Sequence, residues 1–568
     1  MRPHSKFWPL RLPRSITTPE TTLVFNLDVT ATRYPEKDAI RFFGANLTYS
    51  GLKRQVEALA GWLQHVANVA PGDRVLLYLQ NSPQHVVATY AILRAQAVVV
   101  PVNPMNRAEE LRHYITDAGA RVVICAADLV GVVTQANEEI GVSERVRHLL
   151  VTRYADAMPP REAMDPEEAP PAAWNAWLEA DPPLPAEGSR WNDALAAGHA
   201  PRPSQGKPDD LAVMPYTSGT TGFPKGCMHT HRTIMHNVIA GALMGNSGAD
   251  STALAVVPLF HVTGMLYGMH TPIYGGTTVV VMPRWDRELA GRLISRHRVT
   301  HWTNIPTMII DMFGSPNIEK FDLSSLRNLS GGGAAMPHAV AERLQKQFGI
   351  TYCEGYGLTE TAAPTHTNPP ERAKLQCLGM PYFGTDARVV DPTTLKELPP
   401  GEVGEIIVNG PQVFQGYWRN PAANAAAFIE FEGRTFFRTG DLGRMDEEGY
   451  FFLTDRLKRM INASGFKVWP AEVESLLYKH PAIQEACIIA SHDEYRGETV
   501  KAVVVLRADA KGRTSAEDII GWAREHMAAY KVPRLVEFVD ELPKSGTGKV
   551  MWRALQEREA AREAAAKP

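Results

Sequence analysis

The sequence predicts an α/β protein with a large N-terminal domain and a small α+β domain at the C-terminal end. The chain has 568 residues, which is too long for one ordinary hydrophobic core. Its first half alternates short apolar runs with helical stretches, a pattern typical of parallel sheets. From about Gly401 the pattern changes to short strands and tight turns, and a smaller unit begins after Asp455.

The first long helix is marked by apolar residues three or four positions apart, and it is expected to begin near Thr48 or Ser50. Its apolar positions are Leu52, Val56, Leu59 and Leu63. A strand at 75–79, a helix at 84–93 and an apolar run at 97–102 follow, which is the order of a βαβ unit. Further strands are expected at 121–125, 253–257, 277–282, 326–329 and 350–353.

Residues 157–208 differ from this rhythm because they are rich in proline, alanine and acidic side chains. A long segment without a regular apolar pattern is expected to be a surface excursion. We expect Trp174, Trp177 and Trp191 to pin this segment to the body of the domain rather than to form a ligand box.

In the C-terminal part, a strand is expected at 405–408 and a hairpin turn at 446–449. Pro470 opens a helix whose first turn carries Glu472 and Glu474, favourable at the positive end of the helix dipole. Strands at 483–490, 500–506 and 535–539 and a helix at 515–527 complete a small α+β unit. The tail after Met551 is expected to be helical or frayed, without chemistry of its own.

The composition limits the classes of function. A net charge of −3, from 59 basic and 62 acidic residues, gives no overall field that would attract nucleic acid or anionic lipid. Five cysteines without a C-x-x-C pair exclude a zinc ribbon and argue against a disulfide framework, so a reducing cytoplasm is expected. Neither a signal peptide nor an apolar run of about 18 residues is found. These observations do not exclude binding of the protein to a membrane surface.

The first chemical signal is segment 216–226, YTSGTTGFPKG, which follows an apolar strand candidate. Small hydroxyl residues alternate with glycine, so backbone amides and hydroxyls can approach phosphate oxygens, and Lys225 supplies the opposite charge. The segment is not a Walker A loop, because Gly226 follows the lysine where Ser or Thr would hold magnesium. A phosphate-binding loop is favoured over an ordinary surface loop.

The second signal is segment 354–360, EGYGLTE, directly after the strand that ends at Cys353. Its aromatic ring can stack on a base, and its hydroxyl and carboxylate can serve phosphate and a hard metal ion. A turn with a structural tyrosine fits the segment equally well.

Two further segments, RTGDL at 438–442 and LPKSGTGK at 542–549, contribute a carboxylate and a lysine. A carboxylate in a tight turn can accept both ribose hydroxyls, although Asp441 can also simply cap that turn. Glycine and serine around Lys549 suggest a mobile cationic arm, although such a stretch is more often a solvated loop.

Together and in this order, these segments resemble the adenylate-forming (AMP-binding) superfamily, in its acyl-CoA synthetase and fatty acid–CoA ligase branch. The resemblance covers roughly residues 20 to 555. It implies an enzyme that uses ATP, Mg²⁺ and coenzyme A to convert a carboxylic acid to acyl-AMP and then to acyl-CoA. It also implies an AMP-binding domain over 1–457, with a β-rich subdomain, and a mobile C-terminal domain over 458–568 that carries the catalytic lysine.

The resemblance further implies roles for residues around the nucleotide. The adenine is expected beside Gly333 and Ala334, with Tyr356 stacking on it and Gly357 next to the ring. Glu360 resembles the magnesium ligand, and Thr359 is expected to contact phosphate. The loop that holds the β- and γ-phosphates would consist of Thr217, Ser218, Gly219, Thr220, Thr221, Gly222 and Lys225.

Other implied roles concern the ribose, the thiol and the movement of the small domain. Asp441 and Arg456 match the ribose-binding positions, and Lys458 matches the hinge. Gly465 lies in the stretch that faces coenzyme A, His261 resembles the gate to the thiol tunnel, and Lys549 matches the lysine that grips the α-phosphate and the acyl carboxylate.

The acyl group is less well defined. The positions that line the pocket in the superfamily carry no charged residue here, which disfavours an amino acid, because its ammonium group would need a carboxylate partner. Gly264 and Met265 leave room for an apolar chain. The chain as a whole most resembles medium- and long-chain fatty acyl-CoA ligases, and this resemblance implies a medium- or long-chain fatty acid. The alternative substrate is a short branched, hydroxylated or aromatic acid. Thr303 and Asn304 can hydrogen-bond a hydroxylated or aromatic acid, although Asn304 before Ile305 and Pro306 more often satisfies only backbone groups. The remaining pocket positions are Trp302, 331–334, Ala362 and Ala363.

Two alternatives remain: a stand-alone adenylation enzyme that loads a carrier protein, and a non-catalytic nucleotide-binding protein. No carrier-domain sequence follows Lys549, which favours free coenzyme A. A degenerate site is disfavoured because the four expected polar residues are intact, namely Lys225, Glu360, Asp441 and Lys549. The sequence does not exclude a homodimer.

Overall fold

The computed structural model describes residues 2–217, 224–333, 336–456, 459, 461–463, 466–468, 470–493, 497–545 and 550–565. Contacts divide the chain into two compact units, of which the first comprises Met1–Asp386 and Val408–Phe437. The second comprises Ala387–Ile407 and Arg438–Pro568. The expected boundary between residues 457 and 458 falls where the structure gives no description, and it stays a prediction.

In the described part of the first unit, a seven-stranded sheet runs in the order β11-β8-β4-β3-β5-β6-β7. Its strands pair in parallel except for β11, which is antiparallel to β8. This confirms the predicted βαβ unit, with helix α3 (Pro83–Arg94) between β3 and β4. The strands are β3 (Arg74–Tyr78), β4 (Val98–Pro101), β5 (Val122–Ala126), β6 (His148–Thr152), β7 (Gly188–Arg190), β8 (Leu211–Val213) and β11 (His229–Thr230).

A nine-stranded sheet follows in the same unit, in the order β18-β17-β16-β15-β14-β12-β13-β1-β2 among the described residues. Its centre is parallel, and β2, β17 and β18 add antiparallel strands at its two edges. The strands are β1 (Asp38–Phe42), β2 (Ala45–Thr48), β12 (Thr252–Ala255), β13 (Thr278–Val281), β14 (His301–Asn304), β15 (Asn328–Gly332), β16 (Tyr352–Leu358), β17 (Ala363–Thr367) and β18 (Met380–Pro381).

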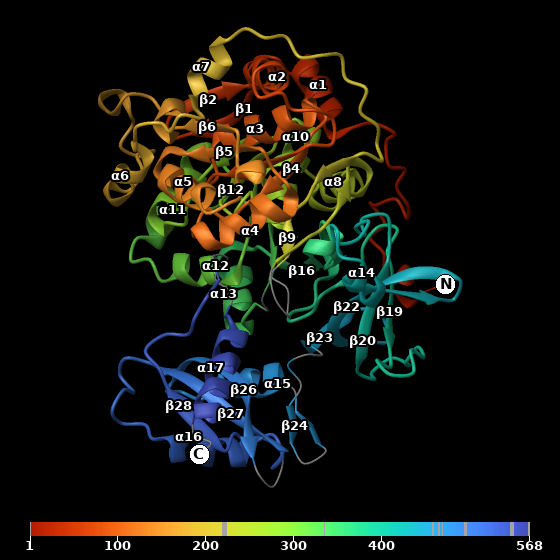
Figure 1. Cartoon of the computed structure of the whole chain (residues 1–568). Helices are drawn as coiled ribbons and strands as arrows, with labels where there is room; N and C mark the ends of the chain where they lie inside the picture. Colours follow the sequence, from red (N-terminus) through yellow and green to blue (C-terminus); the bar gives the residue numbers. More distant parts are fainter. Residues whose placement is uncertain are drawn as a thin grey trace. The chain divides into compact units, whose positions relative to one another are not determined.

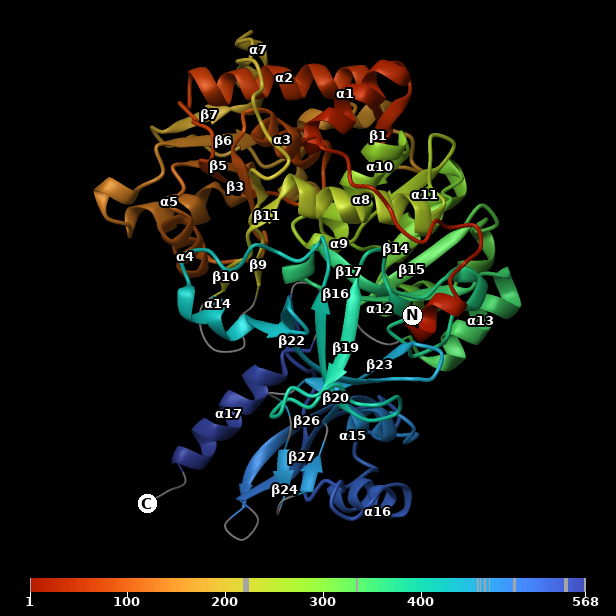
Figure 2. The ribbon, with the colours of Figure 1, turned by 90° about the vertical axis from the view of Figure 1, so that its right-hand side faces the viewer.

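Helices cover these sheets. Most of them bury their apolar faces in one large core, whereas the helices at 108–118 and 130–138 pack into a second apolar cluster. The predicted first long helix is α2 (Tyr49–His65), and the hydroxyl of Thr48 caps it by accepting from the amide of Gly51 at 3.1 Å. Its four predicted apolar positions are buried. Figure 2 shows α2 beside α1 (Leu23–Arg33), and the two helices are in contact. The other helices are α4 (Ala108–Ala118), α5 (Val130–Glu138), α8 (His231–Gly245), α9 (Val262–Met265), α10 (Thr271–Gly275), α11 (Arg287–His297), α12 (Pro306–Phe313) and α13 (His338–Phe348).

The surface excursion at 157–208 is only partly what the sequence suggests. Residues 188–196 form β7 and helix α7 (Trp191–Ala196), and Trp191 is buried in the core. Strand β7 extends the seven-stranded sheet because its backbone pairs with β6. The residues Gly188–Arg190 have no apolar pattern that would predict a strand. Trp177 pins the rest of the segment, since Tyr154 meets its ring edge-on and the guanidinium of Arg284 lies 4.2 Å from the ring centroid.

A further sheet contains the points at which the chain passes between the units. Its described strands run in the order β19-β20-β22-β21, and β23 pairs with β22. They are β19 (Asp386–Val390), β20 (Gly404–Asn409), β21 (Phe428–Phe431), β22 (Arg434–Met445) and β23 (Phe451–Arg456), with helix α14 (Pro421–Ala427) before β21. The predicted hairpin turn joins β22 to β23, and the carboxylate of Asp446 accepts from the amides of Glu448 and Tyr450.

The small α+β unit forms as predicted. Its described strands run in the order β25-β24-β27-β26, with β28 parallel to β27. They are β24 (Ile461–Ala463), β25 (Phe466–Val468), β26 (Ile483–Asp493), β27 (Gly497–Leu506) and β28 (Leu535–Phe538). Helices α15 (Pro470–Leu477) and α16 (Ala516–His526) belong to the same unit.

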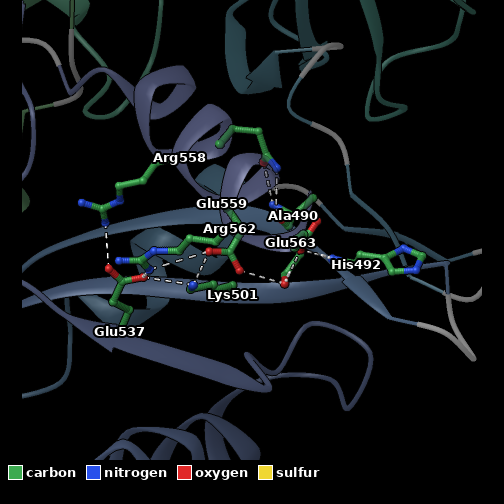
Figure 3. A network of polar contacts seen from close by, with 10 residues as sticks. Ala490, His492, Lys501, Glu537, Arg558, Glu559, Arg562 and Glu563 are labelled. Atoms are coloured by element: carbon green, nitrogen blue, oxygen red, sulfur yellow. Dashed lines mark hydrogen bonds and ion pairs between the residues drawn. The ribbon is translucent and has the colours of Figure 1, made fainter. Parts of the chain in front are cut away.

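The C-terminal tail forms helix α17 (Trp552–Ala565), which a polar network anchors to strands β26, β27 and β28 (Figure 3). The ammonium group of Lys501, largely buried, pairs with the carboxylates of Glu537 and Glu559. Glu537 also pairs with Arg558 and Arg562. The tail is therefore an integral part of the small unit.

Candidate active site

The phosphate-loop candidate closes as a short hairpin. Strand β9 (Tyr216–Thr217) pairs antiparallel with β10 (Lys225–Gly226), so that Thr217 lies directly opposite Lys225. The five predicted loop residues between them, Ser218, Gly219, Thr220, Thr221 and Gly222, lie outside the described residues. The hairpin holds the two ends of the loop together and sets a hydroxyl beside a cation.

Helix α4 braces the base of this hairpin. The hydroxyl of Tyr216 donates to the carboxylate of Asp117 at 2.6 Å, and the ring of Tyr114 packs on Tyr216 with centroids 4.5 Å apart. Nε2 of His113 lies 2.8 Å from the carbonyl oxygen of Pro224. Burial raises the pKa of the Tyr216 hydroxyl far above its ordinary value, so it stays a donor. Sequence reasoning missed this brace, because its residues lie about a hundred positions from the loop.

The second predicted segment forms the end of β16 and the tight turn η9 (Thr359–Thr361). The turn contacts β9, which brings Glu360 near the base of the phosphate loop. Glu360 is buried. The amide of Asn237 donates to the carbonyl oxygens of Thr361 and Ala362, at 3.0 and 2.9 Å, and fixes the turn from helix α8.

His229 supports the same turn from its other side. Its Nε2 lies 2.8 Å from the carbonyl oxygen of Thr359, and Nδ1 lies 3.3 Å from the hydroxyl of Thr233. Burial lowers the pKa of His229 to about 4, so the imidazole is neutral at pH 7 and adds no charge beside Glu360. The sequence contains no spacing signal that would have identified His229 or Asn237, because both act through backbone oxygens of a distant turn.

A tyrosine that sequence analysis did not single out joins the two motifs. The hydroxyl of Tyr417 donates to Oε1 of Glu360 at 2.8 Å. The ammonium nitrogen of Lys225 lies 3.8 Å from the centroid of the same ring, a cation–π contact. A signal was present in the glycine-rich stretch GPQVFQGYW at 410–418, which carries an aromatic pair at a turn.

Three glycines in and next to β15 and β16 are required by close packing or by backbone conformation. A Cβ on Gly331 would lie 2.2 Å from the carbonyl oxygen of Asn304 and equally close to the hydroxyl of Tyr352. One on Gly357 would lie 1.8 Å from the carbonyl oxygen of Ala363. Gly333 has a φ of +82°, the left-handed region that favours glycine. Ala334 lies outside the described residues.

Tyr356 on β16 and Gly333 just after β15 lie close to the same register position. Gly332 pairs with Gly355 between β15 and β16, so Tyr356 and Gly333 each come one position later in the chain. The ring of Tyr356 is partly exposed and packs near His366, with centroids 5.6 Å apart. This arrangement suits a flat ligand that lies along the ends of the two strands.

Two acyl-pocket interpretations change with the structure. The side chain of Asn304 is buried; it donates to the carbonyl oxygen of Trp302 at 3.1 Å and accepts from the hydroxyl of Tyr352 at 3.2 Å. It therefore satisfies internal groups, the second of the two alternatives. A Cβ on Gly264 would lie 2.1 Å from the carbonyl oxygen of Pro258, so this glycine permits a close backbone approach rather than leaving room for a chain.

His261 begins helix α9. Its Nδ1 accepts from the amide of Thr263 at 3.3 Å, and the side chain is partly exposed. A partly exposed imidazole fixed at a helix start can line an entrance, which is compatible with the predicted gate.

In the second unit, Asp441 and Arg456 are directly opposite each other on β22 and β23. Asp441 is buried and lies within a strand, so the prediction that it occupies a tight turn is wrong; Gly440, with a φ of +69°, supplies the local change of direction. Lys458, Gly465 and Lys549 lie outside the described residues. On the two sides of the segment 546–549, Lys544 pairs with Glu485 and the amide of Met551 donates to Pro543.

Magnesium fits this donor set. A Mg²⁺ ion that accompanies a nucleotide commonly takes one or two carboxylate ligands and completes its shell with phosphates and water. Glu360 is a buried carboxylate at the base of the phosphate loop. Within the described residues, no group of three or more His, Cys, Asp or Glu side chains could hold a metal by itself.

Comparison with known proteins identifies the family. The AMP-binding enzyme family matches residues 27–418, and its C-terminal domain matches residues 472–549. The chain belongs to the AMP-binding enzyme family. A long-chain-fatty-acid–CoA ligase of Bacillus subtilis (strain 168) is 36% identical, over 97% of each chain, and a feruloyl-CoA synthase of an Amycolatopsis species is 34% identical, over 91% of this chain and 95% of the relative.

A solved structure supports the same assignment. The anthranilate CoA ligase in complex with anthranoyl-AMP superposes with a TM-score of 0.83, at 26% identity, covering 98% of this chain and 100% of that chain. The AMP-binding enzyme described here is an acid–thiol ligase that acts through an acyl-adenylate and uses ATP, Mg²⁺ and coenzyme A. Of the helices that the structure describes, none is both long and apolar enough to cross a bilayer.

Proposed function

We propose that this AMP-binding enzyme is a fatty acid–CoA ligase for medium- or long-chain acids. The observation that carries the proposal is the near full-length match to a relative named long-chain-fatty-acid–CoA ligase. It agrees with the lack of charged side chains at the expected pocket positions, because a buried unpaired charge would disfavour an alkyl chain.

In the first step, an oxygen of the substrate carboxylate attacks the α-phosphorus of ATP, and the bond to pyrophosphate breaks. We assign Thr217 and Lys225 to the β- and γ-phosphates, because they face each other across the closed hairpin. We assign Thr359 to a phosphate contact and Glu360 to the magnesium ion, which supplies positive charge to the phosphate oxygens when bound. No general base is needed, since the carboxylate is already a nucleophile.

In the second step, the thiolate of coenzyme A attacks the acyl carbon, and AMP leaves. We assign adenine stacking to Tyr356, with Gly333, Ala334 and Gly357 along the base. Asp441 and Arg456 are assigned to the ribose, which agrees with their direct pairing on β22 and β23. His261 is assigned to the gate, Lys549 to the α-phosphate and acyl carboxylate, Lys458 to the hinge and Gly465 to the coenzyme A side.

A screen of acids tests the chain-length assignment. With ATP, coenzyme A and saturated acids from four to sixteen carbons, kcat/KM should rise with length and then fall, since each buried methylene contributes about 0.8 kcal/mol. Chromatography should detect AMP and pyrophosphate. Acid-dependent release of ADP would contradict adenylate formation, and a length-independent profile would contradict the fatty-acid assignment.

A hydroxylated aromatic acid is the second candidate, because the relative named feruloyl-CoA synthase is nearly as similar to this chain. Thr303, on β14, is a candidate donor to such an acid, and its hydroxyl lies 3.5 Å from that of Ser330. Faster turnover of cinnamic-type acids than of alkanoic acids would favour this candidate. Transfer of the acyl group to a carrier protein but not to free coenzyme A would support the carrier-loading alternative.

We also infer a cytoplasmic enzyme. The five cysteines are buried and form no disulfide with one another, which agrees with a reducing compartment. Fractionation of the native cells tests this inference, and recovery of the protein outside the cytoplasm would contradict it.

A further inference from the structure

Tyr417 lies between two side chains of opposite charge. Its hydroxyl donates to Oε1 of Glu360 at 2.8 Å, and the ammonium nitrogen of Lys225 lies 3.8 Å from the ring centroid. Within the part of the chain that the structure describes, Lys225 has no carboxylate at ion-pair distance. The tyrosine therefore contacts both charged groups, while the two groups do not form a pair with each other.

The backbone around the tyrosine holds the ring in this position. The amide of Tyr417 donates to the side chain of Asn424 at 2.6 Å, and the amide of Trp418 donates to the carbonyl oxygen of Gly226 at 2.8 Å. Tyr417 is only 6% exposed. These hydrogen bonds fix the main chain from which the ring projects, and the second one joins it to the strand that carries Lys225.

The two charges would attract each other strongly if the ring were absent. Glu360 is 7% exposed, and opposite charges at such a site interact more strongly than in bulk water. A direct ion pair would occupy the carboxylate that is assigned to magnesium and the ammonium group that is assigned to phosphate. Such a pair would compete with the nucleotide for both partners.

We propose that Tyr417 is a positioning residue that keeps Lys225 and Glu360 apart, so that both stay available to the magnesium complex of ATP. This inference rests on the roles of Lys225 and Glu360 given under Proposed function. The ring face satisfies the cation, and the hydroxyl satisfies one carboxylate oxygen, so neither charge gains by moving toward the other.

The variant Tyr417→Phe tests the inference because it removes the hydroxyl and retains the ring. When the hydroxyl of Tyr417 is removed, Glu360 should turn toward Lys225. Isothermal titration of ATP at a series of Mg²⁺ concentrations should then show that the Mg²⁺ concentration needed for half-maximal binding rises about tenfold or more. In the assay, the loss of rate should be larger at low than at saturating Mg²⁺. Tyr382→Phe, at a buried tyrosine in a separate apolar cluster, is the matched control and should leave the Mg²⁺ midpoint unchanged.

A double-mutant cycle with Lys225→Met identifies the cause of that shift. If Lys225 captures the released carboxylate, Tyr417→Phe should change the Mg²⁺ midpoint much less in the Lys225→Met background than in the wild type. An equal shift in both backgrounds would overturn the separating role, as would the absence of any shift in the single variant. Circular dichroism and the urea midpoint establish that each variant is folded.

Glu360→Gln distinguishes this inference from the assignment on which it rests. If Glu360→Gln leaves the Mg²⁺ midpoint of ATP binding unchanged, the magnesium role of Glu360 is wrong. If Glu360→Gln shifts the midpoint and Tyr417→Phe does not, the magnesium role holds and the separating role of Tyr417 is wrong.

Discussion

At the scale of single residues, Glu354 is a buried carboxylate with an elevated pKa. It precedes the candidate adenine segment on β16 and accepts from the amide of Gln376 at 2.8 Å. Burial raises its pKa to about 7, although hydrogen bonds from the amides of Gln376 and Met336 act in the opposite direction. The folded protein therefore holds this proton to a higher pH than the unfolded chain does.

The elevated pKa of Glu354 predicts a pH-dependent effect of Glu354→Gln. Between the ordinary pKa of 4.5 and about 7 the folded state binds more protons, so the wild type loses stability as pH rises through this window. The amide cannot ionise and avoids this loss. The free energy of unfolding of Glu354→Gln, relative to the wild type, should rise by up to a few kcal/mol between pH 4.5 and 8. Urea unfolding at several pH values measures it, and a difference that does not change with pH would contradict the prediction.

The close packing around Gly331, on β15, predicts that a side chain larger than glycine at this position destabilises the protein. Gly331→Ala places a Cβ 2.2 Å from Asn304 and Tyr352, so it should destabilise the protein by about 1–3 kcal/mol. Gly521→Ala is the matched control: its Cβ meets nothing within 4 Å in helix α16, and it should stabilise the protein by about 0.5–1 kcal/mol. Thermal unfolding compares them. Equal effects would contradict the packing argument.

At the scale of elements, helix α17 depends on one buried cation. Lys501 is 8% exposed and lies between Glu537 and Glu559, which belong to β28 and α17 (Figure 3). By composition this tail is an alanine-rich charged stretch, so the sequence does not decide between a helix and a frayed end. The partners of the helix lie about sixty residues away on β26 and β27, so only the fold brings them together.

Lys501→Met should destabilise the small unit by about 3–5 kcal/mol, because it removes the buried cation that pairs with the buried carboxylate of Glu559 and, among the described residues, leaves only the exposed Arg562, at 4.0 Å. In this variant, the rate of amide hydrogen exchange should increase more in α17 than in the other helices. Lys511→Met, which removes an exposed pair with Asp540, is the control and should change stability by less than about 1 kcal/mol. Equal effects of the two variants would show that burial of the pair is unimportant.

At the scale of the whole molecule, the proposed mechanism requires one small domain to serve two half-reactions. Lys549→Ala should reduce adenylation about 10²- to 10³-fold, because a preorganised cation is lost from the first transition state. Thioester formation from supplied acyl-adenylate should largely survive. Lys458→Pro fixes φ near −65° at the proposed hinge, so pyrophosphate exchange should persist while acyl-CoA formation falls.

Measuring the two half-reactions separately for Lys549→Ala and Lys458→Pro tests domain alternation. Circular dichroism controls for folding. If each variant lost both half-reactions to the same extent, alternation would not describe this enzyme.

The sequence by itself determined the α/β class, most strands and helices, and the segments that carry the chemistry. It could do so because apolar periodicity and turn residues act locally, and because YTSGTTGFPKG and EGYGLTE are contiguous. Only the tertiary structure decided that β7 joins a sheet, that Asp441 lies within a strand, and that Asn304 is satisfied internally. It also decided that Tyr417 lies between Lys225 and Glu360. Those features depend on contacts between residues far apart in the chain, which no local pattern encodes.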